Sequence, residues 1–374
     1  MERKKVAPLP VDQVPQLNEF LGRLDLGRLA DHGTSAHPGR NDNWVGTTSA
    51  GFAIFVKRLV GEPADVAARM RRSRSFHALV ERVGTHELRA PRLLGADEAT
   101  GLEVFALLDG ASSGAELAAD DVFGDTLAHR AGRLVGLLHS SPTEGVVPEL
   151  DRSRLRFPSP ELNTALPLDL FVSLTGAELH LWRIVHQDPQ LTEALSGLRD
   201  RERAAPLRPT HCDLRLDQFL DTGDGLFLTD GEEFRLADPA RDVGSFAGEW
   251  LHQAIAWLTR REAHREADDR FGAPSHEEIV ARGVRRLNRL RPRVRAFLAG
   301  YRSACPDTDP EFTTRAAAVA GWHLIDRALA TAGQSARLSA ISRATMGIGR
   351  NVLLSPETYA ETLGLGPVES LEAA

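Results

Sequence analysis

The sequence predicts an α+β protein with two lobes: a small, β-rich N-terminal lobe over residues 1–108 and a large helical C-terminal lobe over residues 109–374. Three observations lead to this prediction. Two short apolar runs flank a turn at residues 49–51, which is typical of an antiparallel hairpin. From Gly124 onward the apolar residues recur at helical spacing. The chain of 374 residues is also long enough to bury two separate cores.

In the N-terminal lobe we expect a sheet of short strands with one helix, preceded by a leader over residues 1–38 that contains an amphipathic helix. The expected strands cover residues 44–48, 52–57, 88–95 and 101–108, and the expected helices cover residues 11–29 and 64–83. The dipeptide Asp109-Gly110 ends the last strand as a turn, which would be the hinge between the lobes.

The remainder of the chain predicts helices, interrupted by a loop-rich interval with several prolines that ends near Pro167. The helices are expected over residues 126–139, 169–186 and 191–203, and over most of residues 244–365. Ser275 and Glu278 form a capping box at the start of one of them, and Pro292 is expected to kink that helix.

Composition limits the kinds of partner. A formal net charge of −7 argues against bulk binding of nucleic acid. No apolar run approaches the roughly 18–20 residues of a membrane span, and the N-terminus shows no signal peptide. The two cysteines, Cys212 and Cys305, do not form a disulfide framework. We therefore expect a cytoplasmic protein with reduced thiols that binds neither nucleic acid nor membrane.

The most informative segment runs from Arg208 to Leu220. It places Asp213 two residues after His211, and Gln218 five residues after Asp213. A second carboxylate, Asp230, follows the apolar run 225–229, which predicts a short buried strand. This is the layout of a kinase catalytic loop with its metal-binding partner: Asp213 accepts the proton of the acceptor hydroxyl, while Gln218 and Asp230 hold Mg²⁺ against the phosphates of ATP.

A less specific interpretation makes Asp213 and Asp230 surface carboxylates in two turns. A lone His-x-Asp is common, but its combination with an amide and a second Asp at these spacings favours the kinase interpretation. The fold expected from it is bilobal and protein-kinase-like.

Lysine is rare in this chain, which makes Lys57 conspicuous. Of 45 basic residues only Lys4, Lys5 and Lys57 are lysines. Lys57 ends an expected strand upstream of the Asp213 loop, and a compact ammonium suits a phosphate contact. The alternative is a strand-end lysine that reaches solvent.

Two further segments are candidates for nucleotide binding. The loop 38–43 contains Gly39, which would let backbone amides approach phosphates, and Asn43; a plain turn is the alternative. At the expected hinge, backbone groups of Phe105, Ala106 and Leu107 would meet the adenine edge.

With these residues in place, the sequence resembles the aminoglycoside phosphotransferase family, relatives of protein kinases, over residues 30–330. The resemblance rests on four pieces in order: the loop with Lys57, the run 136–139, the run 211–218, and the run 230–232 with 238–242. It implies that Asp213 is the catalytic base, that Gln218 and Asp230 are metal ligands, and that Lys57 contacts phosphate. It also implies that Asp242 is a structural carboxylate that bonds backbone near the catalytic loop. His211 is expected to be structural.

Two departures from the family pattern stand out. The family usually has Asn where this chain has Gln218. It also pairs its strand lysine with a helix Glu, but the corresponding position holds Ser73, and Glu62 and Glu81 are misplaced. Something else must orient Lys57. Arginines of that helix (Arg71, Arg72 and Arg74) would either contact phosphate or form a solvated face.

The sequences of residues 39–44, 55–57 and 211–218 resemble those of a narrower group, the kinase subunit of class V lanthipeptide synthetases. That resemblance implies phosphorylation of Ser and Thr in a ribosomally made precursor peptide, with a partner lyase that eliminates phosphate and a cyclase. Arg215, two residues past Asp213, would steady the transferring phosphoryl group; the alternative is an ordinary loop arginine. Seven arginines in residues 282–295 would dock an acidic leader, or form a solvated helix face.

Two other functions stay open at this point. One is a small-molecule kinase acting on an aminosugar or choline-like alcohol, with an acidic and aromatic pocket built from Glu249, Trp250 and Trp257. The other is a nucleotide-binding pseudokinase scaffold that presents a peptide to a lyase.

Overall fold

The computed structural model describes residues 9–30, 32–36, 39–155, 160–258 and 275–366. The chain forms two compact units that interleave along the sequence. One, here called the sheet unit, comprises Met1–Phe123, Ser140–Arg152 and Leu216–Leu236. The other, called the helical unit, comprises Gly124–His139, Ser153–Arg215 and Ala237–Ala374. Within the described residues, no helix is long and apolar enough to cross a bilayer.

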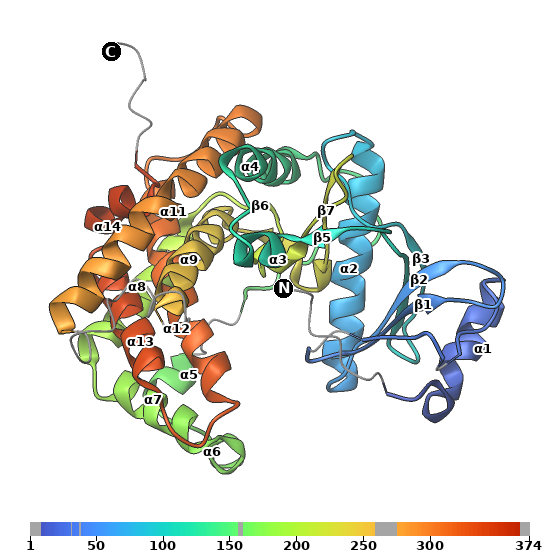
Figure 1. The fold of residues 1–374 in the computed structure, drawn as a ribbon, viewed down its shortest axis with the longest axis horizontal. Helices are drawn as coiled ribbons and strands as arrows, with labels where there is room; N and C mark the ends of the chain where they lie inside the picture. The colour runs from blue at the N-terminus through green and yellow to red at the C-terminus, as the bar shows by residue number, and fades with distance from the viewer. Residues whose placement is uncertain (1–8, 31, 37–38, 156–159, 259–274, 367–374) are drawn as a thin grey trace, which may run out of the picture. The chain divides into compact units, whose positions relative to one another are not determined.

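A four-stranded antiparallel sheet in the order β1-β2-β4-β3 forms the first part of the sheet unit (Figure 1). Its strands are β1 (Asp42–Thr47), β2 (Ala53–Arg58), β3 (Leu93–Asp97) and β4 (Leu102–Ala106). The hairpin predicted around residues 49–51 is present, with Trp44 opposite Val56. Strand β3 begins five residues later than predicted, after Pro91, because proline cannot donate a ladder hydrogen bond.

Helices cover the two faces of this sheet. The short helices η1 (Val11–Gln13) and α1 (Pro15–Arg23) bury Leu17 and Phe20 against Trp44, Ile54 and Val104. The helix predicted to reach residue 29 ends at Arg23, because Asp25 and Gly27 adopt positive φ angles of 56° and 83°. The long helix α2 (Pro63–Val83) lies on the other face, close to its predicted bounds.

Residues 216–236 belong to the sheet unit, although the predicted boundary at residue 108 would place them with the helices. Two kinds of contact tie them there. Strands β5 (Ser112–Ser113), β7 (Phe219–Asp221) and β8 (Leu226–Leu228) form a small sheet in the order β5-β7-β8. The turn η3 (Gly231–Glu233) packs against α2. The remaining elements of this segment and its neighbours are α3 (Gly114–Ala119), η2 (Leu216–Gln218) and β9 (Arg235–Ala237).

The helical unit is built around α12, which packs on α9 and α13. Its helices are α4 (Asp125–Ser140), α5 (Pro160–Thr164), α6 (Leu168–Ser173), α7 (Gly176–His186), α8 (Pro189–Ala204), α9 (Ala240–Trp257), α11 (His276–Ala304), α12 (Phe312–Ala332), α13 (Ala340–Leu354) and α14 (Pro356–Leu363), and its strand is β6 (Arg208–Thr210). The helix predicted over residues 169–186 is two helices, because Thr175 and Glu178 form a capping box that starts a new one. Helix α11 runs through Pro292 without a break.

Glycine permits a close crossing of α4 and α11. A Cβ atom added to Gly132 would lie 1.9 Å from the Phe297 carbonyl oxygen, so no larger residue fits there. This crossing brings His139, at the end of α4, beside Tyr301 of α11.

Candidate active site

Strand alternation places Lys57 on the face of the sheet that α2 covers. Ile54 and Val56 of β2 point into the α1 side of the core, so Phe55 and Lys57 point the other way. Glu103 and Phe105 of the neighbouring strand β4 share that face, and Lys57 pairs with Glu103 in the ladder. Two contacts with α2 confirm the assignment: Ser73 bonds Glu103, and the ring of His77 lies 5.3 Å from that of Phe105.

The turn after β8 brings two carboxylates to Lys57. The ammonium of Lys57 contacts Asp230 Oδ1 and lies 2.8 Å from Glu232 Oε2. Asp230 adopts the left-handed conformation, with φ 65° and ψ 52°, which turns the chain sharply between the two acids. Gly231 between them lies against Phe76, where an added Cβ would come within 2.5 Å of the ring. The chain therefore needs glycine to bring η3 this close to α2.

These contacts decide the charge of Lys57. Only 12% of its side chain is exposed, and burial by itself disfavours the ammonium. The carboxylates of Asp230 and Glu232 outweigh that burial and hold the pKa of Lys57 above its usual value. Lys57 is therefore a fixed cation, as a phosphate contact must be. The alternative of a strand-end lysine that reaches solvent does not describe this side chain.

Glu232 pairs with Lys57 in place of the helix glutamate that the sequence lacks. Helix α2 contributes a cation, Arg69, instead of a carboxylate. Arg69 of α2 is fully buried, and its Nη2 lies 2.8 Å from Glu232 Oε2 and 2.8 Å from Asn41 Oδ1. One carboxylate oxygen thus bonds both Arg69 and Lys57. In the usual arrangement, a glutamate of the helix pairs with the strand lysine. Here an arginine of the helix, Arg69, pairs with a glutamate of the turn, Glu232, and that glutamate pairs with Lys57.

The other arginines predicted as phosphate contacts fall into two groups, one buried and one exposed. Arg72 donates to the Glu232 carbonyl oxygen at 2.6 Å and pairs with Asp151 at 3.3 Å, so it anchors the backbone of the same turn. Arg71 and Arg74 are exposed, which agrees with a solvated helix face.

Buried Glu103 gives this site a pH-dependent group. Burial raises the pKa of Glu103 from about 4.5 to about 7, against the hydrogen bond from Ser73. A folded pKa above the unfolded one means that protonation stabilises the fold, and that this stabilisation is lost as the pH rises from about 4.5 to about 7. We expect Glu103→Gln to gain about 2–3 kcal/mol relative to wild type across that interval, measured by urea unfolding at several pH values.

The matched control for that experiment is Glu98→Gln on an exposed loop, which should show the pH dependence of the wild type. Any constant effect of the amide at position 103 cancels, because only the change with pH is compared. Parallel pH curves for Glu103→Gln and wild type would show that Glu103 does not titrate near neutrality.

Gln218 and Asp230 meet, as a shared metal site requires. Gln218 Nε2 lies 3.3 Å from Asp230 Oδ2, and Thr229 Oγ1 donates to Gln218 Oε1 at 3.2 Å. Among the described residues there is no cluster of three or more His, Cys, Asp or Glu side chains that could enclose a metal by itself. One carboxylate and one amide oxygen suit Mg²⁺, which keeps several waters and takes further ligands from phosphates.

In the helical unit, Asp242 holds the backbone of the predicted catalytic loop. Its carboxylate is fully buried and accepts from the amides of His211 at 2.8 Å and Cys212 at 2.9 Å. His139 Nε2 lies 2.9 Å from the same carboxylate, and its Nδ1 lies 3.0 Å from the Tyr301 hydroxyl. Burial alone would raise the pKa of Asp242, but the hydrogen bond and charge of His139 and the groups around His211 hold it below the usual value. These are the backbone bonds that the family resemblance implied.

The residues that follow this anchor include the candidate base. Cys212 adopts a positive φ of 70°, an uncommon conformation for a residue with a side chain. Asp213 comes next, and its carboxylate lies 3.5 Å from Arg215 Nη2, with 37% of the Asp213 side chain exposed. Arg215 therefore pairs with the candidate base itself. Asp213 and Arg215 belong to the helical unit, whereas Lys57, Gln218 and Asp230 belong to the sheet unit.

The candidate nucleotide-binding residues of the expected hinge lie where the central strand β4 ends. The amide of Ala106 donates to the Arg92 carbonyl at 2.9 Å and that of Leu107 to the Ala53 carbonyl at 3.1 Å. These two amides are thus used by the sheet itself, which leaves them no hydrogen for adenine. Phe105 packs against Phe55, with 6.2 Å between the ring centroids.

At the other end of the sheet, Asn43 pairs with Lys57 in the β1–β2 ladder. Gly39 is exposed and has open space where a Cβ would stand, so the fold itself does not require glycine there. Pro38 of the same predicted loop lies outside the described residues.

The residues proposed for a cationic small-molecule pocket are engaged with the chain's own cations. Glu249 accepts from His323 Nε2 at 2.7 Å, a bond that outweighs burial and holds the pKa of Glu249 at about 2. Arg293 lies over the ring of Trp250 at 5.3 Å, and Arg286 over the ring of Trp257 at 5.6 Å. Two of the seven arginines of α11 are thus cation–π partners of tryptophan.

Comparison with known proteins supports the fold. No family model matches the chain, and no curated protein matches it. A choline/ethanolamine kinase family protein from Mesorhizobium loti is 17% identical, with 95% of this chain and 99% of that chain covered and a TM-score of 0.52. Choline kinase LicA from Streptococcus pneumoniae, solved with AMP, is 14% identical, with 91% and 98% covered and a TM-score of 0.53.

A third structure is the amicoumacin kinase hAmiN, solved with AMP-PNP, Ca²⁺ and Ami; it is 12% identical, with 92% of this chain and 96% of that chain covered and a TM-score of 0.52. The chain has the fold of these kinases. At such low identity the likeness concerns the fold alone, and the predicted α+β, protein-kinase-like fold is confirmed by it.

Proposed function

We propose that this protein is an ATP- and Mg²⁺-dependent phosphotransferase. The observation that carries the proposal is the cluster around Lys57: a buried ammonium that touches two carboxylates, with the amide of Gln218 donating a hydrogen bond to one of them. Phosphoryl transfer needs this combination, because the enzyme contributes positioning and electrostatic stabilisation rather than covalent chemistry.

Each residue of the cluster has a role in this proposal. Gln218 and Asp230 hold Mg²⁺, which neutralises charge on the phosphates. Lys57 contacts the phosphates through its ammonium, which the carboxylate of Glu232 holds in place. Asp213 orients the acceptor hydroxyl and accepts its proton, and Arg215 beside it faces the transferring phosphoryl group.

We propose further that the acceptors are Ser and Thr hydroxyls of a precursor peptide. The narrower sequence resemblance to lanthipeptide kinases supports this, as does Arg215. The contacts of three other residues support it as well. A choline-like cation would need Glu249, Trp250 and Trp257 as partners, but Glu249 bonds His323, and arginines lie over the two tryptophan rings. A partner lyase would then remove the Cα proton and expel phosphate from Cβ, and a cyclase would add a Cys thiol to the resulting alkene.

A small alcohol is the second candidate acceptor. The fold neighbours favour it, since two of them are named for choline kinase activity or the choline/ethanolamine kinase family and a third for phosphorylation of amicoumacin. For such a substrate to bind as a cation, His323 or the arginines would have to move away from Glu249 and the tryptophans.

Mass spectrometry after incubation with ATP and Mg²⁺ distinguishes these functions. The acceptors are Ser- and Thr-containing peptides, choline, ethanolamine and aminosugars. We expect a mass increase of one phosphate group on peptides, lost again when a phospho-Ser/Thr lyase is added. Phosphate on a small alcohol, with peptides unchanged, would replace the peptide proposal. Absence of turnover on every acceptor, with nucleotide bound, would indicate a pseudokinase scaffold.

A further inference from the structure

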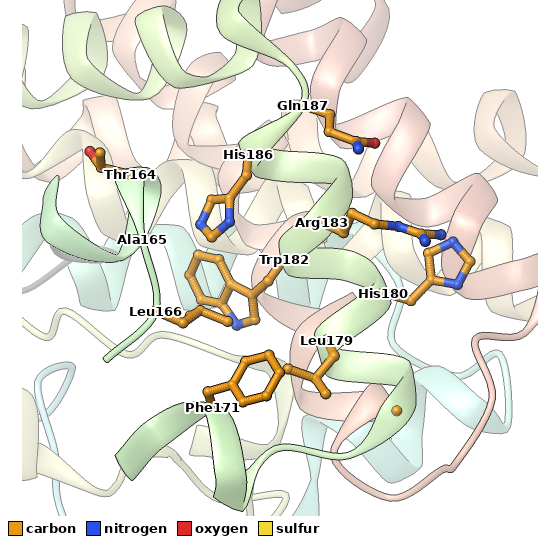
Figure 2. A pocket seen from close by; sticks show the side chains of 11 residues that line it. Thr164, Ala165, Leu166, Phe171, Leu179, His180, Trp182, Arg183, His186 and Gln187 are labelled. Atoms are coloured by element: carbon orange, nitrogen blue, oxygen red, sulfur yellow. The ribbon is translucent and has the colours of Figure 1, made fainter. Parts of the chain in front are cut away.

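Helices α5, α6 and α7 of the helical unit enclose a cavity that the proposed chemistry does not use. Its volume is about 770 Å³. The residues that line it come from the end of α5, the following turn, α6 and the length of α7 (Figure 2): Thr164, Ala165, Leu166, Phe171, Gly176, Leu179, His180, Trp182, Arg183, His186 and Gln187. We call this cavity the α7 groove. None of the groups placed in the active site lines it.

One side of the α7 groove is apolar and extends onto the surface. Figure 2 shows Leu166, Phe171 and Trp182 together on one side of α7. Helix α6 buries none of its residues: Leu168 is 76% exposed, Phe171 49% and Val172 72%. Three large apolar side chains exposed on one short helix, beside a concave apolar wall, are typical of a surface that another molecule covers.

The other side of the α7 groove is cationic. Arg183 and His180 lie one helical turn apart and next to each other on the side of α7 away from Trp182 (Figure 2). Arg183 is exposed. Among the described residues that line the cavity there is no Asp or Glu, in a chain of net charge −7. The nearby carboxylate Glu178 is committed to the capping box of α7. The charge of the lining residues is therefore opposite to that of the whole molecule, while Glu161 of α5 and Asp169 of α6 stand outside the lining.

We propose that the α7 groove docks an acidic, amphipathic segment of the peptide substrate, such as its leader, outside the catalytic loop. Apolar side chains of that segment cover Phe171 and the small part of Trp182 that lines the groove, since most of that ring is buried in the core, and its carboxylates face Arg183. A helical segment with apolar residues at i, i+3 and i+4 presents both kinds of group at this spacing. The inference deepens the proposed peptide kinase activity and rests on it.

The α7 groove suits this segment better than the arginine-rich part of α11 does. There, Arg286 and Arg293 already lie over tryptophan rings. The α7 groove combines a cation with an apolar cavity. The apolar cavity contributes affinity, and the cation on one side sets the orientation of the bound peptide. A peptide held there keeps its Ser and Thr residues at high effective concentration near Asp213, which lowers KM without changing kcat.

The test measures binding to the full-length protein in the absence of ATP. The probe is a fluorescein-labelled peptide with Leu at helical spacing and Glu at the intervening positions, and its twin carries Gln in place of Glu. We expect the Glu peptide to bind more tightly than the Gln twin by fluorescence anisotropy. Arg183→Glu and Phe171→Ser should each weaken binding of the Glu peptide about tenfold or more.

Matched controls are Arg130→Glu, which reverses an exposed charge on α4, and Val122→Ser, which removes an exposed apolar side chain. Both should bind as the wild type does. Equal binding of the two peptides, or wild-type binding by Arg183→Glu and Phe171→Ser, overturns the proposal. A dimer that becomes a monomer on Phe171→Ser, by sedimentation, would overturn it by assigning the groove to a second copy of the chain. Because no turnover is measured, failure here is separate from failure of the kinase proposal.

Discussion

Asp213→Asn is expected to lower the turnover of phosphoryl transfer by about 10³-fold while leaving nucleotide affinity unchanged. The amide keeps the size of the carboxylate and its place in the loop, but it cannot accept the proton of the acceptor hydroxyl. The loop itself should persist, because its backbone is held by the buried carboxylate of Asp242 and not by Asp213. Turnover with a saturating acceptor and the affinity for a labelled ATP analogue are the two measurements.

The comparison variant is Asp217→Asn, an amide at another acidic position of the same segment. It should retain turnover within about threefold of wild type, since Asp217 has no assigned part in proton transfer. Turnover of Asp213→Asn close to that of Asp217→Asn would remove Asp213 from the chemistry. Loss of nucleotide binding in Asp213→Asn would point to a structural role instead.

The parts of this site that were predictable depend on local pattern. Alternation along β2 and β4 puts Lys57 on one face of the sheet, and the apolar run 226–228 delivers Asp230. The bonds of Asp242 to the loop amides also matched the resemblance. In each case the interaction follows from strand geometry or from a motif of fixed spacing.

The partner of Lys57 was not predicted, because it depends on how η3 approaches α2. A search for a helix Glu after Lys57 finds Ser73, which instead bonds Glu103. A usable signal was present: Arg69 and Arg72 lie on the same stripe of α2 as buried Phe76. Cations on a core-facing stripe require buried carboxylates, and Glu232 and Glu233 follow Asp230 after a single glycine.

The division of the helix over residues 169–186 could also have been recognised. Thr175 and Glu178 have the spacing of a capping box, the signal that correctly placed the start of α11 at Ser275. Periodicity alone carries across such a break, because the spacing of apolar residues does not show where one helix ends and the next begins.

Arg69→Met and Glu232→Gln are expected to have the largest effects on stability and on the binding of ATP. Arg69 is fully buried, so removing either partner leaves a buried charge or an unpaired amide, at a cost of about 3 kcal/mol in the free energy of unfolding. The double variant should cost less than the sum of the two, with a coupling of about 1–3 kcal/mol measured by urea unfolding. Lys57 also loses its anchor, so KM for ATP should rise about tenfold at temperatures where the variants are folded.

The KM for ATP distinguishes a positioning role from a purely structural one. A variant that only unfolds more easily would show normal KM in its folded fraction, whereas a displaced Lys57 raises KM. Arg69→Lys should bring the KM for ATP part of the way back to the wild-type value, because a lysine retains the charge that holds Glu232. The matched control is Arg58→Met, next to Lys57 on β2, whose pair with Asp42 is partly exposed and should contribute about 1 kcal/mol or less. Additive costs for Arg69→Met and Glu232→Gln, together with unchanged KM for ATP, would mean that α2 does not control Lys57 through Glu232.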